Sequence, residues 1–340
     1  MLLLLAASST TIISCNTKKE ERKIERSFYY WRSVFHLSPF EEQQLKQLNV
    51  KLLYVKFFDV VWDIAETRPT PVAKLQNTSY KLPNDIQVIP TVFITNECME
   101  RLDPLQVGSL ADKITGLVMS IDSANAFSLQ IEEIQIDCDW TPTTKEKYFA
   151  LLKAIKLNSH VPISATIRLH QVKFMSSTGV PPVDKGLLMC YNMGNLKKTG
   201  TKNSIIETEE LKKYIGNLNA YPLQLDMALP LFNWKVLFRN NEYSGLIQNL
   251  PDDSLKASFT QKKENRYELL KDTLLKGYSL KKGDILRTEE SSYATIITVA
   301  EEVNKRLKNT RPRVALYHLD SLLLSKYSSH ELENIYNSMR

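Results

Sequence analysis

The chain has 340 residues, of which 43% are hydrophobic and 24% are charged, a globular composition that suits one large domain or two ordinary ones. Its net charge of +6 is modest, and no basic stripe with interleaved aromatic residues occurs, so we expect no nucleic-acid partner. The chain contains 10 glycines, none of them in a GxGxxG pattern, so the sequence predicts neither a dinucleotide or P-loop site nor any other cofactor.

The N-terminal segment, MLLLLAASSTTIISC, has the pattern of a secretory signal and is too short to span a bilayer, which needs about 20 apolar residues. The three residues before Cys15 resemble a bacterial lipobox, in which the cysteine is lipidated and becomes the mature N-terminus. We expect residues 1–15 to be a lipoprotein signal peptide and residues 16–26 a charged tether. The protein would then be anchored by lipid in the cell envelope, in a periplasmic or surface-exposed leaflet; the alternative is a leader with an incidental cysteine.

Apolar, β-branched or aromatic runs recur along the rest of the chain and alternate with helix-like segments. The predicted strands are residues 27–31, 51–60, 86–95, 132–139, 162–169, 186–193, 223–230 and 313–320. Helices are expected over residues 40–48, 104–122, 143–157, 206–218 and 321–339. Residues 231–312, between the seventh and eighth strands, form a long insertion for which we expect helices and a hairpin.

Strands that alternate with helices in this way favour an α/β fold of the (β/α)8 TIM-barrel type. Residues 27–340 would then form a single TIM-barrel domain that carries the 231–312 insertion, and we expect a monomer. The alternative architecture is an open, doubly wound sheet.

In such a barrel the chemistry lies at the C-terminal ends of the strands. The side chains near these ends are carboxylates, amides, cations and aromatic rings, namely Trp31, Lys56, Asp59, Glu97, Asp137, Asp139, Trp140, Arg168, Tyr191, Asn192, Asp226, Trp234 and His318. Carboxylates and amides hydrogen-bond sugar hydroxyls, and aromatic faces cover the apolar face of a sugar ring. The pattern predicts a carbohydrate site at the barrel mouth; the alternative is that polar strand ends only mark where loops begin.

Asp137 and Asp139 lie two residues apart on the fourth predicted strand, so both should point into the barrel. Two confined carboxylates repel unless one is protonated or a cation lies beside them. Arg168 on the next strand is the natural partner, and Lys56 is another. The alternative to a functional site is a structural Asp–Arg network buried in the barrel.

A metal site is a further alternative for the same acids. Asp137, Asp139, His170 and His318 offer nitrogen and oxygen ligands, but no HxH or HxxxH pair occurs and three strands would have to converge. We therefore expect no metal.

Two strands resemble signature motifs of the family 18 glycoside hydrolases, the chitinases and endo-β-N-acetylglucosaminidases. IQIDCDW resembles the fourth-strand motif DxxDxDxE, with Asp137, Asp139 and Trp140 matching its second Asp, its third Asp and a common Trp. LMCYNM resembles the sixth-strand motif M-x-Y-[DN], through Met189, Tyr191 and Asn192. The third strand lacks the family's glycine motif, and the eighth ends in Tyr-His instead of tryptophan. In overall layout the chain is similar to a poorly characterised group of bacterial barrel lipoproteins.

The resemblance implies that Asp139 orients the N-acetyl group of the substrate, which serves as the nucleophile. The glutamate that protonates the glycosidic oxygen in the family is replaced here by Thr141, whose hydroxyl is no general acid. Glu97 or Asp226 could supply the proton, Asp139 itself could do so with a pKa raised by Asp137, or the site binds glycan without cutting it. If the strand continues to residue 141, Thr141→Glu would restore an acid to the mouth.

The sequence thus predicts an exported lipoprotein with a glycosidase-like barrel that binds a glycan without hydrolysis. The alternative is an active hydrolase with a different acid. The candidate catalytic residues are Asp137, Asp139 and Asp226. The candidate substrate-binding residues are Trp31, Trp140, Arg168, Tyr191, Asn192, Trp234 and His318.

Overall fold

The computed structural model describes residues 22–76, 80–127, 131–248 and 250–340. The predicted signal peptide, the predicted lipidation site Cys15 and the first part of the predicted tether lie outside these residues. Within the described part of the chain, no helix is both long enough and apolar enough to cross a bilayer.

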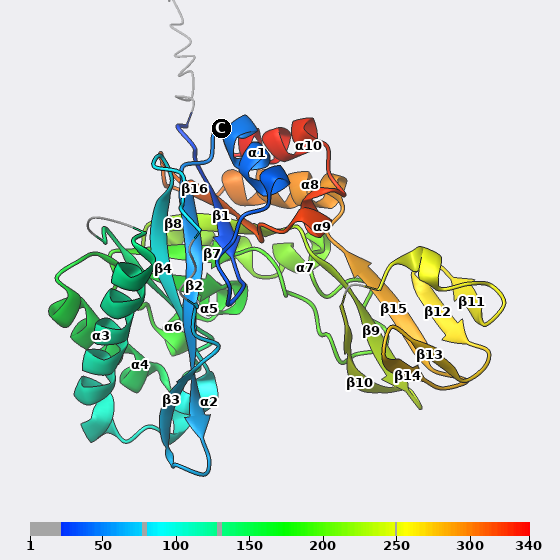
Figure 1. Ribbon diagram of the computed structural model, residues 1–340, viewed down its shortest axis with the longest axis horizontal. Coiled ribbons are helices and arrows are strands. Elements are labelled where there is room, and N and C mark those ends of the chain that lie inside the picture. The colour runs from blue at the N-terminus through cyan, green and yellow to red at the C-terminus, as the bar shows by residue number, and fades with distance from the viewer. Residues whose placement is uncertain (1–21, 77–79, 128–130, 249) are drawn as a thin grey trace, which may run out of the picture.

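A closed barrel of parallel strands forms the body of the molecule (Figure 1). In the described chain its eight strands are β1 (Glu25–Tyr30), β2 (Leu52–Asp63), β4 (Gln87–Ile94), β5 (Ile134–Cys138), β6 (Ile163–Arg168), β7 (Lys185–Met189), β8 (Leu225–Pro230) and β16 (Arg313–Tyr317). Neighbouring strands pair in this order around the barrel, and β1 closes it by pairing with both β2 and β16. Each predicted strand overlaps one of these, so the predicted TIM barrel is confirmed.

Helices cover the outside of the barrel. They are α1 (Pro39–Gln47), α2 (Asn96–Arg101), α3 (Val107–Asn125), α4 (Lys145–Ser159), α5 (Leu169–Lys173), α6 (Met175–Thr178), α7 (Thr208–Lys212), α8 (Tyr293–Asn304), α9 (Ser321–Leu324) and α10 (Ser329–Asn337). Helix α4 shows why they pack this way, because its apolar residues Tyr148, Leu151, Leu152 and Ile155 recur at helical spacing and are all buried. Lys153, Lys156 and Asn158 on the other side of the helix are exposed.

The N-terminal end of the barrel is sealed by a buried network of charges. Glu133 accepts from Arg313 at 2.6 Å and pairs with Lys185 at 3.1 Å. Asp226, the second residue of β8, accepts from the backbone N–H of Arg313 at 2.9 Å and from Asn309 Nδ2 at 3.1 Å. The prediction that Asp226 lies at the mouth is therefore wrong: β8 begins at residue 225, so Asp226 lies at the opposite end.

A hairpin extends the barrel wall beyond the mouth. The last part of β2 pairs antiparallel with β3 (Arg68–Val72), and Figure 1 shows the two strands projecting past their neighbours. Pro69 and Pro71 lack an N–H donor, which suits β3 to the edge position it occupies. The same prolines hide the strand from a sequence-based prediction.

The long insertion is mainly β-structure. Its strands are β9 (Asn233–Arg239), β10 (Glu242–Ile247), β11 (Thr260–Lys263), β12 (Arg266–Leu269) and β15 (Ile285–Glu290). They form one sheet in the order β10-β9-β15-β12-β11, here called the insertion sheet, with a small hairpin of β13 (Thr273–Leu275) and β14 (Tyr278–Leu280) beside it.

The insertion sheet stands out to one side of the barrel in Figure 1. It has its own small apolar core, which includes Leu250, Leu269 and Leu286. The expectation of a hairpin is met and extended, and the expectation of helical content within residues 231–312 is met by α8 (Tyr293–Asn304), whereas residues 260–290 form mainly strands. Helix α8 follows the sheet and belongs to the helical layer of the barrel, where it contacts α10 and α7.

Candidate functional site

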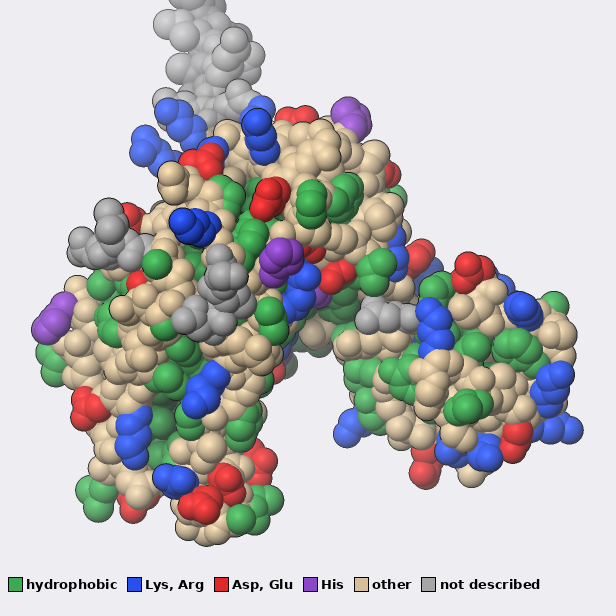
Figure 2. Space-filling model, in the orientation of Figure 1, with side chains coloured by type: hydrophobic (Ala, Val, Ile, Leu, Met, Phe, Trp, Pro, Cys, Tyr) green, Lys and Arg blue, Asp and Glu red, His purple; other side chains and the backbone are tan. Residues whose placement is uncertain are grey.

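A cavity of about 550 Å³ lies at the C-terminal mouth of the barrel. Its lining comprises Trp31, Asp59, Phe93, Asp137, Arg168, Met189, Tyr191, Asn192, Phe232, Asn233, Trp234, Gln248, Tyr317, His318, Asp320, Leu322 and Leu323. Strand ends of the barrel supply most of these residues, and the insertion supplies Phe232, Asn233, Trp234 and Gln248. Figure 2 shows the surface deeply indented between the barrel and the insertion sheet.

Asp137 is the buried carboxylate of this cavity. Gln135 points into the barrel, because its side-chain oxygen accepts from the hydroxyl of Tyr29 on β1 at 2.5 Å. Residue 137 is two positions further along the strand and points to the same side. The hydroxyl of Thr166 donates to Asp137 Oδ1 at 2.6 Å. Burial raises the pKa of Asp137 to about 6, with the nearby Arg168 opposing that rise and Asp139 adding to it. Asp137 can therefore carry a proton at mildly acidic pH.

Asp139 lies at the rim and is engaged by Arg168. The guanidinium contacts both carboxylate oxygens, through Nε to Oδ1 and through Nη2 to Oδ2 at 3.0 Å. The carboxylate side chain is 47% exposed and that of Arg168 is 17% exposed. Arg168 is thus the partner of the acids that the sequence predicted. Arg168 lines the cavity, whereas Asp139 does not.

Aromatic rings form a continuous series around the cavity. The ring of Trp31 lies 5.6 Å from that of Tyr317, which lies 5.4 Å from that of Tyr191. Phe232 continues the series, 5.8 Å from Tyr191 and 5.1 Å from Trp234. Tyr191 is buried and the other four rings are partly exposed, and such exposed ring faces can cover the apolar faces of sugar rings.

The hydroxyl of Tyr191 is a polar group without a partner. It is buried and makes no hydrogen bond to the described residues. The amide nitrogen of Gln135 and Nδ1 of His318 are likewise buried and without a hydrogen bond to those residues. Burial raises the pKa of Tyr191 and lowers that of His318, so both are neutral near pH 7. Tyr191 and His318 line the cavity, so a ligand or water there could supply their missing partners.

Trp140 does not line the cavity. Its side chain is fully buried behind β5, stacked on Tyr148 at 5.2 Å, and its Nε1–H donates to the carbonyl of Thr178 at 2.9 Å. The predicted role in substrate binding is therefore wrong. Trp140 follows the even-numbered residues of β5, which point away from the barrel axis, whereas the odd-numbered ones point into it.

The other acids proposed from the sequence also lie outside the cavity. Glu97 is half exposed on α2 and pairs with Arg101 at 2.9 Å.

Thr141, at the position of the family's acid, lies beyond strand β5, which ends at Cys138. The hydroxyl of Thr141 contacts those of Thr143 at 2.8 Å and Thr144 at 3.3 Å. Thr141 thus belongs to the turn that leads into α4.

The remaining predicted residues come together in the cavity: Trp31, Arg168, Tyr191, Asn192, Trp234 and His318 all line it. Phe93, Phe232, Gln248 and Tyr317 line the cavity as well but are not among the candidate residues, and Asp59, noted from the sequence only as a strand-end residue, lines it too. Phe93, Phe232 and Tyr317 lie at or just beyond strand ends, a signal that could have found them. Gln248 comes from the insertion and carries no such signal. Across the described residues, no three His, Cys, Asp or Glu side chains are grouped so that they could hold a metal ion.

No protein-family model matches the chain, and no curated protein is similar to it in sequence. Solved structures are similar in fold. The spore cortex-lytic enzyme SleL of Bacillus cereus has a TM-score of 0.54 at 13% identity, over 94% of this chain and 75% of that one. A chitinase from Chromobacterium violaceum has a TM-score of 0.55 at 10% identity, over 93% of this chain and 99% of that one.

A third structure contains a glycan: the GH18 chitinase of Cycas revoluta in complex with (GlcNAc)3 has a TM-score of 0.54 at 11% identity, over 92% of this chain and 99% of that one. At identities this low, the similarity shows only that the folds are alike. The chain has a TIM barrel like that of the family 18 glycoside hydrolases, as its motifs predicted.

Proposed function

We propose that the chain binds a glycan containing N-acetylglucosamine in the cavity at the barrel mouth. The observation that carries this proposal is an aromatic-lined cavity whose lining includes two buried polar groups, Asp137 and the hydroxyl of Tyr191, which has no partner among the described residues. Such a site offers ring faces for stacking and hydrogen-bonding groups for hydroxyl or amide atoms. The similarity of the barrel to chitinases, one of them in complex with (GlcNAc)3, supports the choice of glycan.

We propose further that binding occurs without hydrolysis. The position of the family's acid is Thr141, which contacts its own turn instead of the cavity. Two further carboxylates near the mouth each lie beside a cation, since Asp59 Oδ2 pairs with Lys56 at 3.0 Å and Asp139 pairs with Arg168. Asp320 accepts hydrogen bonds from backbone N–H groups at the start of α9, including that of Leu322 to Oδ1 at 2.9 Å. A positioned donor for a glycosidic oxygen is therefore missing among them.

One observation favours the alternative of an active hydrolase. Asp137 lies in the cavity, and burial raises its pKa to about 6. A carboxylic acid with a pKa in this range can donate a proton at mildly acidic pH, as a general acid must. In this alternative Asp137 takes the role that the sequence assigned to Asp139, Glu97 or Asp226.

Calorimetry with (GlcNAc)3 and with longer chitin oligosaccharides tests the binding proposal. We expect Tyr191→Phe and Trp31→Ala each to weaken binding at least about tenfold, which is about 1.4 kcal/mol. Asp226→Asn is the matched control for Asp137→Asn, because Asp226 is a buried aspartate with a similarly raised pKa at the other end of the barrel. Asp137→Asn should weaken binding and Asp226→Asn should leave it unchanged. Equal effects of these two variants, or no binding by the native chain, would refute the proposal.

Product analysis on the same oligosaccharides separates the two functions. A binding protein leaves them intact at every pH, whereas a hydrolase that uses Asp137 cleaves them, with a rate that falls as pH rises through about 6. Loss of cleavage in Asp137→Asn would then establish the hydrolase.

We also propose that the protein is anchored to the cell envelope through a lipid on Cys15. The proposal rests on the apolar leader, the lipobox-like residues before Cys15 and the charged segment after it. In the native host, Cys15→Ser should move the protein out of the membrane fraction. Unchanged fractionation of the variant would show that no lipid is attached there.

A further inference from the structure

Two residues of the insertion sheet form an ion pair that is completely buried. Arg287 and Glu289 lie on the same face of β15, and Arg287 Nε donates to Glu289 Oε1 at 2.6 Å. Both side chains are 0% exposed. Val236 and Phe238 of β9 share this face and are buried apolar residues, so the pair lies in a setting that could have been packed by hydrocarbon alone.

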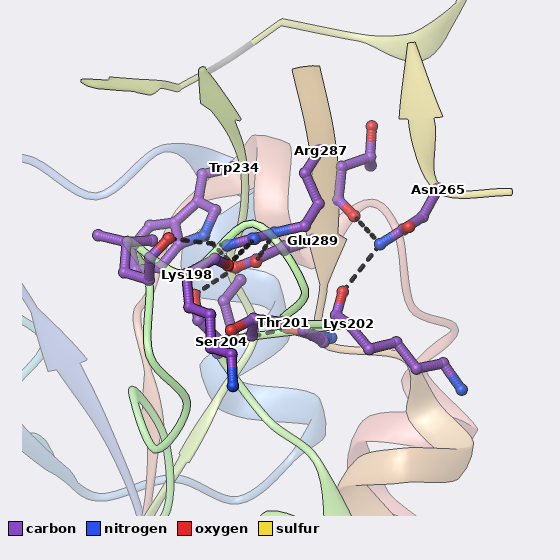
Figure 3. A network of polar contacts seen from close by, with 12 residues as sticks. Lys198, Thr201, Lys202, Ser204, Trp234, Asn265, Arg287 and Glu289 are labelled. Carbon is purple, nitrogen blue, oxygen red and sulfur yellow. Dashed lines mark hydrogen bonds and ion pairs between the residues drawn. The ribbon is translucent and has the colours of Figure 1, made fainter. Parts of the chain in front are cut away.

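The carboxylate of the pair holds a residue of the candidate site (Figure 3). Glu289 Oε2 accepts from Trp234 Nε1 at 2.7 Å and from the hydroxyl of Ser204 at 2.5 Å. Glu289 and Trp234 are directly opposite each other in the β15–β9 pairing. The one polar atom of the indole is thereby used by the protein, and the partly exposed ring is fixed where it lines the cavity.

The guanidinium of the pair holds the segment that follows β7. Arg287 Nη2 donates to the carbonyl of Leu196 at 2.9 Å, and Nη1 donates to that of Lys198 at 2.8 Å. This segment begins with the cavity residues Tyr191 and Asn192. This single buried pair thus links Trp234 on β9 to the segment of chain that follows Tyr191.

Core packing alone does not explain why charges are retained here. A buried ion pair has a desolvation penalty comparable to its Coulomb attraction, and well-packed apolar residues often replace such a pair at no loss of stability. The pair does supply something that apolar residues cannot, namely a charged acceptor aimed at an indole N–H. A ring ordered in advance loses less conformational entropy when a ligand stacks on it.

We propose that Glu289, oriented by Arg287, is a positioning residue that holds Trp234 as a platform for a sugar ring. The proposal rests on the glycan-binding function proposed above and extends it to the ligand's size. Trp234 is separated from Tyr191 by Phe232, which contacts both rings. The platform therefore takes a second sugar beyond the one at Asp137 and Tyr191, so the ligand is an oligosaccharide and not a monosaccharide.

The indole N–H signals of the intact protein test the positioning without any ligand. The chain has four tryptophans, and Trp234→Phe identifies the signal of Trp234 in a ¹⁵N spectrum. Glu289→Gln should shift or broaden that signal and leave the signal of the buried Trp140 in place, which also reports that the barrel is folded. An unshifted Trp234 signal would overturn the positioning role.

Calorimetry with (GlcNAc)3 tests the platform. We expect Glu289→Gln to weaken binding about tenfold and Ser204→Ala, which removes the other partner of the same oxygen, to change it less than about twofold. In a Trp234→Phe background, Glu289→Gln should have no further effect, because it acts through Trp234. An additional loss in that background would overturn the proposal in favour of a structural role. If the native chain bound no glycan, the platform and the proposed function would both fail, while the indole signal would still report the anchoring of Trp234.

Discussion

Arg168 holds both carboxylate oxygens of Asp139, with Nη2 at 3.0 Å from Oδ2. Two residues earlier on the same strand, Thr166 donates to Asp137 at 2.6 Å. One strand, β6, therefore sets the surroundings of both acids of the motif on β5. It gives Asp139 a cation at the exposed rim and gives Asp137 a neutral donor in the buried interior. Two carboxylates of one type are thus placed in different electrostatic surroundings, which is how an acid site divides its roles.

Replacing Arg168 with methionine should raise the pKa of Asp137 above its present value of about 6. Arg168 opposes the rise that burial causes, and its removal also leaves the charge of Asp139 uncompensated. Carboxyl carbon shifts in a pH titration by NMR, with Asp137→Asn to assign the signal, would measure the change. A pKa that stayed constant or fell would show that the cation does not act on Asp137.

The raised pKa of Asp137 should make the protein less stable as pH rises. In the folded chain Asp137 keeps its proton up to about pH 6, whereas a free aspartate loses it near 3.8. Between these values the folded state binds more protons, so the free energy of unfolding falls with increasing pH. Asp137→Asn removes this contribution, at most about 3 kcal/mol between about pH 4 and about pH 7. Denaturant unfolding of both proteins at the two pH values measures it, and equal pH dependence would contradict the prediction.

Asp226 should contribute in the same direction from the opposite end of the barrel. Burial raises its pKa to about 6, and Lys185 opposes that rise. Because the two sites are distant and share no partner, the effects of Asp137→Asn and Asp226→Asn on the pH dependence should add. The same unfolding series on the double variant tests this. A double variant with the pH dependence of either single one would show that the two acids are coupled.

The barrel was predictable because its strands are buried on both sides and appear as continuous apolar runs. The site was predictable where it depends on strand ends and on two-residue alternation, as for Asp137, Arg168 and Tyr191. Trp140 was misassigned because a motif match outweighed the alternation that places it outside. Asp226 was misplaced because only the structure fixes where β8 begins.

The extent of the insertion sheet, beyond the expected hairpin, was missed for a different reason. Its strands β11 and β12, and strands β13 and β14 of the hairpin beside it, are only three or four residues long, and β11 and β12 include charged residues such as Lys262 and Arg266. Runs this short hold too few residues for a period of two to be visible. The buried pair of Arg287 and Glu289 is even less visible, since charged residues in sequence normally indicate an exposed surface.

The two tryptophans next to the site should respond in opposite ways to truncation. Trp140→Ala empties a fully buried space and leaves the Thr178 carbonyl without its donor, so it should destabilise the fold by about 3–5 kcal/mol. Trp31→Ala, at a partly exposed position in the cavity, should affect stability less and glycan affinity more. Denaturant unfolding and calorimetry on the two variants measure both quantities. Loss of affinity in a folded Trp140→Ala protein, with none in Trp31→Ala, would reverse the assignment of the two rings.

Introducing a glutamate at position 141 should not make the chain a hydrolase. The sequence-based expectation that Thr141→Glu restores an acid required β5 to continue to residue 141, and the strand ends at Cys138. The side chain at 141 lies in the turn before α4, with the hydroxyls of Thr143 and Thr144 as its neighbours. A general acid contributes typically 10²–10⁴-fold only when it reaches the glycosidic oxygen.

Thr143→Glu, which adds the same acid to the same turn, is the matched control for Thr141→Glu. Product analysis on (GlcNAc)3 should find both variants as inactive as the native chain if it is a binding protein. Cleavage by Thr141→Glu, with none by Thr143→Glu or by the native chain, would mean that residue 141 reaches the bound glycan. The turn would then have to rearrange when the ligand enters, and the chain would be a hydrolase that lacks one residue.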